Sequence, residues 1–175
     1  MKGFALKFLD IMIGIILGLG FQWWPNLVES WQYIAFIFVY LDIIDYWIDF
    51  LPALHKFPPI AEIDWFLEMG IMFFLFLFIY TTQTTISYFL WSFIGFRIID
   101  TLWLWRAKTE YKPTHTESLY VNTWIKFNII EILASLILVL YKFPFPSLTV
   151  LGIFIAFRLT TRVLASLKYK RVHFT

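Results

Sequence analysis

The amino-acid sequence predicts an all-α, polytopic membrane protein: a single domain over residues 1–175 with six transmembrane helices. Composition is the first observation, because the chain is 61% hydrophobic and only 15% charged, whereas soluble domains average about 45–50% apolar and about 25% charged residues. The second is a mean hydropathy of +0.75. The third is that the apolar residues form six stretches, each long enough to cross a hydrocarbon core about 30 Å thick as a helix.

The composition also excludes several classes of protein. A chain of 175 residues cannot bury this much apolar surface in one core, so we expect lipid to cover its outer faces. The net charge of +2 and the lack of a large basic block do not favour nucleic acid as a partner. There is no cysteine, which rules out disulfides and thiolate ligands. All three histidines fall outside the apolar stretches, so we expect no haem, no metal site and no other cofactor.

Short polar or proline-containing segments separate the six predicted spans. The first span is followed by Pro25 and the second is ended by Pro52, while the sequence KFPFP divides the fifth from the sixth. Proline has no backbone N–H and clashes with the preceding turn, so we expect it at the ends of spans. The spans cover approximately residues 4–21, 27–51, 63–80, 86–105, 119–141 and 148–167.

The distribution of lysine and arginine predicts the orientation in the membrane. Cytoplasmic loops are enriched in these residues. Alternate loops place nine of them on one side, against Lys142 alone on the other, and the nine are Lys2, Lys7, Lys56, Arg106, Lys108, Lys112, Lys168, Lys170 and Arg171. We therefore expect a multi-pass protein of the cell membrane with both termini in the cytoplasm.

Charged residues within the spans lie mostly in the cytoplasmic half, and they share helix faces. Asp42, Asp45 and Asp49 fall within a stripe of about 60° on the second span. A charge facing lipid at the centre of a helix costs about 2.5–3.5 kcal/mol by insertion scales. We therefore expect charged side chains from different spans to face one another, in a network of Asp10, Asp42, Asp45, Asp49, Arg97, Asp100, Lys126, Glu131, Arg158 and Arg162.

The charges predicted within the spans do not balance. Adding Lys7 and Glu68 to the network gives seven acids and five bases, hence an excess of two negative charges that protons, cations or water must offset. Three interpretations remain open at this stage. The network fixes the register of the helices during assembly, or it forms a hydrated pathway for cations or protons, or it binds a substrate or lipid headgroup.

The first span contains a motif with a counterpart in a known family. Phe8-Leu9-Asp10, followed by IMIGIILGLG, resembles the opening of the six-helix prokaryotic potassium channels related to the lysosomal transmembrane potassium channel. In that family an arginine precedes a Phe-Ser-Asp motif. Here Leu9 replaces the serine, and Phe4 occupies the place of the arginine.

This resemblance implies a tetramer with the first helix at its centre. It also implies that Asp10 anchors a polar network near the cytoplasm and that Ile15 and Leu19 form an apolar pore constriction. Gly14 and Gly18 lie on one face of the same helix, a spacing that permits close contact between helices.

We thus expect a non-enzymatic, homo-oligomeric protein embedded in membrane lipid that acts as a channel or transporter for a cation, potassium or a proton. The alternative is a non-catalytic accessory or scaffold subunit that contacts other proteins of a larger membrane complex. A more distant alternative is a lipid-modifying enzyme, because Asp42-x-x-Asp45 has the spacing of a metal-binding pair. The depth of Asp42 argues against that alternative, because lipid phosphates lie at the membrane surface.

Overall fold

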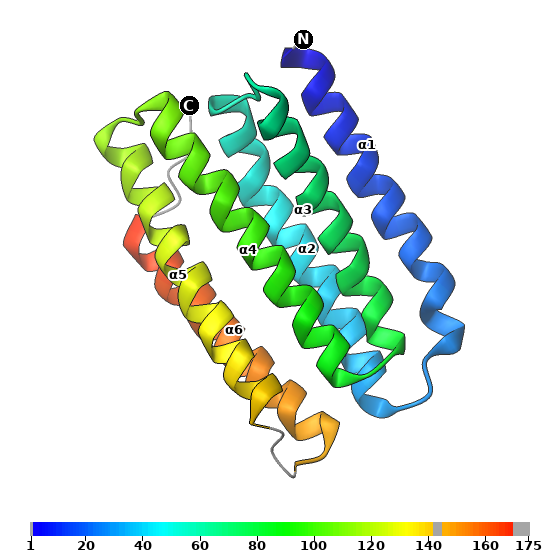
Figure 1. Ribbon diagram of the computed structural model, residues 1–175. Helices are drawn as coiled ribbons and strands as arrows, with labels where there is room; N and C mark the ends of the chain where they lie inside the picture. The colour runs from blue at the N-terminus through cyan, green and yellow to red at the C-terminus, as the bar shows by residue number, and fades with distance from the viewer. Residues whose placement is uncertain (1, 142–144, 170–175) are drawn as a thin grey trace.

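The computed structural model describes residues 2–141 and 145–169. In these residues it contains helices and no strand, which confirms the all-α prediction (Figure 1). The α-helices are α1 (Lys2–Gly20), α2 (Ser30–Lys56), α3 (Glu62–Tyr80), α4 (Ile86–Tyr111), α5 (His115–Leu140) and α6 (Ser147–Tyr169), with 3₁₀ segments η1 (Phe21–Asn26) and η2 (Thr81–Gln83).

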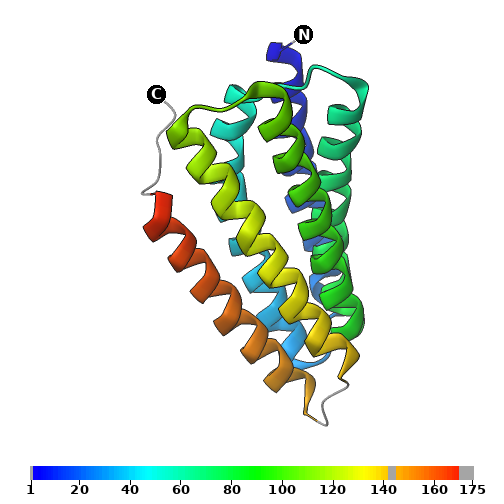
Figure 2. The same cartoon turned by 60° about the vertical axis from the view of Figure 1, so that its left-hand side comes forward.

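Successive helices run in opposite directions, so the start of α1 and the end of α6 lie at the same end of the bundle (Figure 1). We call this the terminal end, and we call the end that holds η1 and η2 the opposite end. Helix α4 packs between α3 and α5, and Figure 2 shows α5 lying between α4 and α6. Helix α2 contacts both α3 and α6, whereas α1 lies at the edge of the bundle against α3 and α2.

Four segments of the described chain are long and apolar enough to cross a membrane: Lys7–Asn26, Glu62–Gln83, His115–Leu140 and Ser147–Lys168. This finding supports a multi-pass membrane protein. Helices α2 and α4 have 27 and 26 residues, which is sufficient length, but charged residues interrupt their apolar runs.

Basic residues mark the terminal end of the bundle. Lys7, Lys56, Lys108, Lys112 and Lys168 are exposed there. Three residues that the orientation prediction counted, Lys142, Lys170 and Arg171, lie outside the described residues.

The prediction that Pro52 ends the second span is wrong for the helix, because α2 continues through it to Lys56. Proline removes one backbone donor, but the turn that follows is still closed. The N–H of Phe57 donates to the carbonyl oxygen of Ala53 at 2.8 Å. Pro52 therefore lies within the last turns of α2 and does not terminate it.

Side chains fix the start of two helices that carry site residues. The Thr85 hydroxyl accepts a hydrogen bond from the backbone N–H of Tyr88 at the start of α4. Before α5, the backbone N–H of Thr114 donates to Glu117 Oε2 at 2.8 Å, as in a capping box. At the other end of α4, Lys112 adopts a left-handed conformation with φ of 45° and redirects the chain into α5.

Aromatic rings fill the interior toward the opposite end. Phe78, Phe89, Phe93 and Phe154, from α3, α4 and α6, are all buried, and we call them the aromatic plug. Their ring centroids lie 4.8–5.5 Å apart in four contacts, within the range of favourable aromatic pairs. The plug leaves the terminal half of the interior for polar side chains.

Glycines distinguish the packed and open faces of the helices. A Cβ added at Gly95 of α4 would overlap the ring of Phe74 on α3, so this glycine permits a close approach between the two helices. By contrast, a Cβ at Gly14 or Gly18 would meet nothing within 4 Å. The close helix contact expected at this pair in α1 is therefore not made within the described chain.

Candidate functional site: a buried charge cluster

Eight charged side chains from four helices meet in the interior, from the middle of the bundle toward its terminal end. We call them the charge cluster. They are Asp42, Asp45 and Asp49 of α2, Arg97 and Asp100 of α4, Glu131 of α5, and Arg158 and Arg162 of α6. Their ion pairs form two separate chains of alternating sign.

The longer chain runs through Asp42, Arg158, Glu131, Arg97 and Asp100. Arg158 Nη2 lies 2.9 Å from Asp42 Oδ1, and its Nη1 lies 3.1 Å from Glu131 Oε1. Arg97 Nε lies 2.8 Å from Glu131 Oε2, in a direction that does not meet hydrogen-bond geometry, and its Nη1 lies 3.7 Å from Asp100 Oδ2. Both arginines and Glu131 are at most 2% exposed, so water does not screen these pairs.

Neutral side chains donate hydrogen bonds to two acids of this chain, Asp100 at its end and Glu131 in its middle. The Tyr46 hydroxyl donates to Asp100 Oδ1 at 2.9 Å, and Asn128 Nδ2 donates to Asp100 Oδ2 at 2.7 Å. The Thr161 hydroxyl donates to Glu131 Oε1. Hydrogen bonds of this kind stabilise a buried carboxylate that water does not reach.

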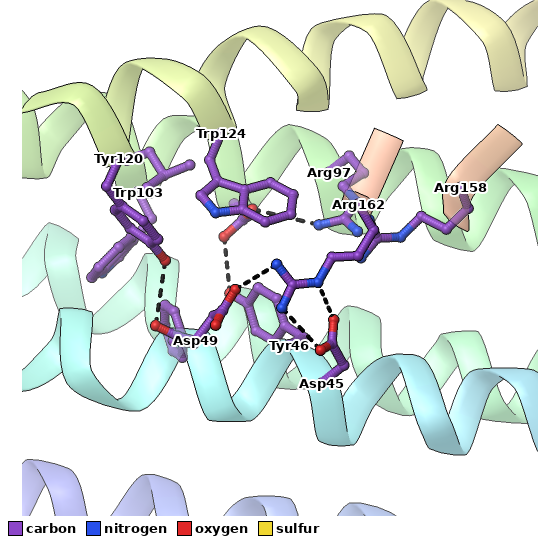
Figure 3. A pocket seen from close by; sticks show the side chains of 12 residues that line it. Asp45, Tyr46, Asp49, Arg97, Trp103, Tyr120, Trp124, Arg158 and Arg162 are labelled. Carbon is purple, nitrogen blue, oxygen red and sulfur yellow. Dashed lines mark hydrogen bonds and ion pairs between the residues drawn. The ribbon is translucent and has the colours of Figure 1, made fainter. Parts of the chain in front are cut away.

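The shorter chain lies nearer the terminal end, where Arg162 reaches between Asp45 and Asp49 (Figure 3). Arg162 Nη2 is 2.9 Å from Asp45 Oδ1, and its Nη1 is 2.7 Å from Asp49 Oδ2. The guanidinium also lies 5.4 Å from the ring centroid of Trp124, a distance at which a cation–π interaction is favourable. The side chains of this group are 12–34% exposed, so it forms the rim of the cluster.

Each chain of ion pairs begins and ends with an acid. Within the described residues, the pairs of the longer chain join three acids and two bases, and in the shorter chain Arg162 lies between two acids. When every carboxylate is ionised, the five residues of the longer chain carry one net negative charge (3 − 2 = 1). Uncompensated charge in a low-dielectric interior is costly, so the buried longer chain favours one additional positive charge.

A pocket of about 350 Å³ opens between α2, α4, α5 and α6 and exposes parts of both chains. Its charged walls are Asp45, Asp49, Arg97, Asp100, Arg158 and Arg162, and its aromatic walls are Tyr46, Phe50, Trp103, Tyr120 and Trp124. Figure 3 shows Trp124 above Arg162 and the two aspartates of α2 below it. Carboxylates of both chains, Asp45, Asp49 and Asp100, thus line the same pocket.

Two residues that the sequence placed in the network lie elsewhere. Asp10 is exposed on α1, because this helix turns Leu9, Ile13 and Ile16 toward the bundle and so directs Asp10 away from it. Lys126 is exposed on α5, because that helix buries the neighbouring Phe127 and Asn128 instead. Both predictions of membership in the buried network are therefore wrong for this chain.

Three other residues named from the sequence also lie outside the cluster. Ile15 and Leu19 are 45% and 41% exposed on the outer face of α1 and do not line the pocket. Lys7 is exposed on the same helix. Any constriction by Ile15 and Leu19 would thus require other copies of the chain.

Sequence reasoning missed three contributors to the site. Tyr46 lies one helical turn after Asp42, so the 3.6-residue period indicates that it shares the acidic face. By the same period, Thr161 shares a face of α6 with Arg158, and Trp124 shares a face of α5 with Glu131. Glu68 was counted with the network, but it is fully buried on α3 and does not line the pocket.

Comparisons with protein-family models, curated proteins and solved structures give no match to this chain. Within the described residues, no group of three or more His, Asp or Glu side chains is arranged to hold a metal ion. Interpretation of the site therefore depends on its own geometry, in which the acid excess and the pocket are the informative features.

Proposed function

We propose that this protein spans the membrane six times, with its terminal end in the cytoplasm, and transports a monovalent cation, a proton or potassium, using the charge cluster as binding site. The supporting observation is the acid excess in the buried longer chain of ion pairs. A bound proton or cation would neutralise that excess, and the pocket that Asp45, Asp49 and Asp100 line is the proposed place of entry.

The faces of α2 and α4 support six spans rather than four. Their charged residues point into the bundle, since Asp42, Arg97 and Asp100 are at most 9% exposed. Their outer faces are apolar, with Ile44 of α2 and Leu102 of α4 among the exposed side chains. Lipid would therefore contact hydrocarbon side chains on both helices, and the charged side chains would avoid the free-energy cost of facing lipid.

The aromatic plug suggests how passage is controlled. Its four rings close the interior between the cluster and the opposite end. A cation bound at the cluster leaves on that side only after these rings move. We therefore propose gated conduction or alternating access, in which movement of the plug opens the outer path.

A channel form of this proposal uses several copies of the chain. Ile15 and Leu19 lie on the outer face of α1 at the edge of the bundle, so an oligomer with α1 at a shared axis would bring them together. This is the arrangement that the potassium-channel resemblance predicts. Measuring the mass of the purified particle in nanodiscs distinguishes it from a single working protomer.

The second candidate is a non-catalytic subunit of a larger membrane complex. It is favoured by the open Gly14 and Gly18 face of α1, which permits close approach by a helix of another protein. We do not propose a lipid-modifying enzyme, because Asp42 and Asp45 each pair with a different arginine.

The test is cation flux into liposomes that contain the purified protein. For proton flux, a potassium gradient with valinomycin supplies the driving force, and a pH-sensitive dye inside the vesicles reports proton entry. For potassium flux, valinomycin is left out and a protonophore is added, so that the same dye reports the proton movement that balances potassium flux through the protein. We expect flux above protein-free vesicles, and loss of flux in Asp42→Asn and Asp45→Asn. Glu62→Gln, a change at an exposed acid of α3, is the matched control.

Two results would contradict the proposal. Absence of both proton and potassium flux in the wild type, with the protein correctly inserted, would exclude transport of these ions. Normal flux in both aspartate variants would show that the cluster has a purely structural role.

A further inference from the structure

Glu68 is a buried acid that the charge cluster does not include. It lies on α3, about two turns from the start of the helix, and its exposed fraction is 0%. Neither carboxylate oxygen has a hydrogen-bond partner within the part of the chain that the structure describes. Trp103 of α4 is the neighbour whose indole N–H can donate to it, but the geometry falls short of a hydrogen bond.

Among the side chains that the structure describes, the charged groups around Glu68 do not include a base that pairs with it. Asp64, one turn earlier on α3, instead holds Arg106 of α4 at 3.2 Å and accepts from the N–H groups of Ile60 and Ala61 at 3.1 and 2.9 Å. Asp64 is thus a stabilised carboxylate whose positive partner is already engaged.

The other described titratable groups near the terminal end of the neighbouring helices do not pair with Glu68 either. Tyr111 of α4 lies close enough for its charge to interact with Glu68, but it is neutral unless the solution is strongly alkaline. On α1, Lys7 and Asp10 are exposed, and on α2, His55 and Lys56 are exposed. An ionised carboxylate without a partner is very costly to bury, so the neutral, protonated form of Glu68 fits this position.

A small pocket lies beside this region, although Glu68 is not among its lining residues. It has a volume of about 210 Å³ and is lined by Asp64, Arg106, Glu110 and Trp103, among others. Trp103 also lines the pocket of the charge cluster. Trp103 is thus shared by the two pockets, and it is also the α4 neighbour of Glu68.

We propose that Glu68 is a proton-binding site in the terminal half of the bundle. Its carboxyl group releases a proton to water and becomes a carboxylate, and it regains a proton from water. This inference rests on the proposed transport function, because it makes the proton the transported or the coupled ion. It goes further in assigning the proton to a residue outside the charge cluster.

Infrared spectroscopy of the whole purified protein tests the binding site without relying on transport. A protonated carboxyl group has a carbonyl stretching band that shifts when the solvent is changed from H₂O to D₂O. We expect such a band to persist above pH about 5, where exposed carboxyl groups are ionised, to disappear as the pH is raised further, and to be missing in Glu68→Gln. Glu62→Gln makes the same change at an exposed position of the same helix and should retain the band.

Proton flux in the same liposomes tests the role in transport. We expect proton flux to fall to the level of protein-free vesicles in Glu68→Gln and to be partly retained in Glu68→Asp, which keeps a titratable group. Wild-type flux that Glu68→Gln leaves unchanged would overturn the inference. So would a spectrum with no band specific to Glu68, or a band that never changes with pH. Absence of flux in the wild type, with a titrating Glu68 band present, would instead overturn the proposed transport and leave the proton-binding site established.

Discussion

Glu131→Gln is the substitution that best measures how strongly the charge cluster depends on its central acid. Glu131 is fully buried and faces Arg97 Nε at 2.8 Å and Arg158 Nη1 at 3.1 Å. The hydrogen bond from Arg158 to this carboxylate contributes about 1.5–3 kcal/mol, and the contact with Arg97 adds attraction without hydrogen-bond geometry. Glutamine keeps an acceptor, and the arginines keep Asp100 at 3.7 Å and Asp42 at 2.9 Å, so we expect a loss near the lower limit.

The expected destabilisation is therefore about 1.5 kcal/mol, because the substitution leaves two acids and two bases in the longer chain and no buried charge without a counterpart. Unfolding in mixed micelles with increasing dodecyl sulfate, followed by tryptophan fluorescence, measures it. Asp49→Asn is the matched comparison at the rim of the cluster, where Arg162 retains Asp45, and it should cost about 1 kcal/mol or less. A smaller loss for Glu131→Gln than for Asp49→Asn would refute the argument that burial and sharing make Glu131 the central acid.

Two further predictions concern packing and topology. Gly95→Ala should destabilise the bundle by about 1–3 kcal/mol in the same unfolding assay, because the added methyl overlaps the ring of Phe74. Gly152→Ala, where the methyl meets nothing within 4 Å, should be neutral or slightly stabilising. Equal effects of the two substitutions would contradict the close α3–α4 packing. Since the chain has no cysteine, single cysteines at Val28 and Lys108, both exposed and at opposite ends, report orientation. A membrane-impermeant thiol reagent added to intact cells should label Val28→Cys alone, and labelling of both or of Lys108→Cys alone would exclude the proposed topology.

The all-α class was predictable because the chain contains long apolar runs of helical length. Apolar runs and the turns between them also located the helix ends to within four residues, except that α2 and α4 extend five and six residues beyond the predicted spans. Pro52 shows where this reasoning stops. A proline signals a helix end on average, but the bonding of the turn that follows, here from Phe57 to Ala53, decides whether the helix continues.

The acidic stripe of α2 was predictable for a local reason: residues three and seven positions apart share a face of any helix. The arginines that meet it were not assignable one by one, because their partners depend on the packing of α6 on α2. Asp10 illustrates the same limit. Its helix has apolar residues on several faces, and the sequence does not show that Leu9, Ile13 and Ile16 form the face that packs on the bundle.

The charge balance distinguishes a structural network from a binding site. The sequence indicates an excess of two acids, and the structure retains it, since Asp10 and Glu68 leave the cluster together with Lys7 and Lys126. A network that served only to align helices would gain most from equal numbers of acids and bases, because every surplus buried carboxylate is costly. Here the longer chain has an acid at both ends, and Glu68 is a further buried carboxyl group without a base among the described residues. An excess of buried acids is unfavourable for assembly alone, and under the proposed function a bound proton or monovalent cation offsets it.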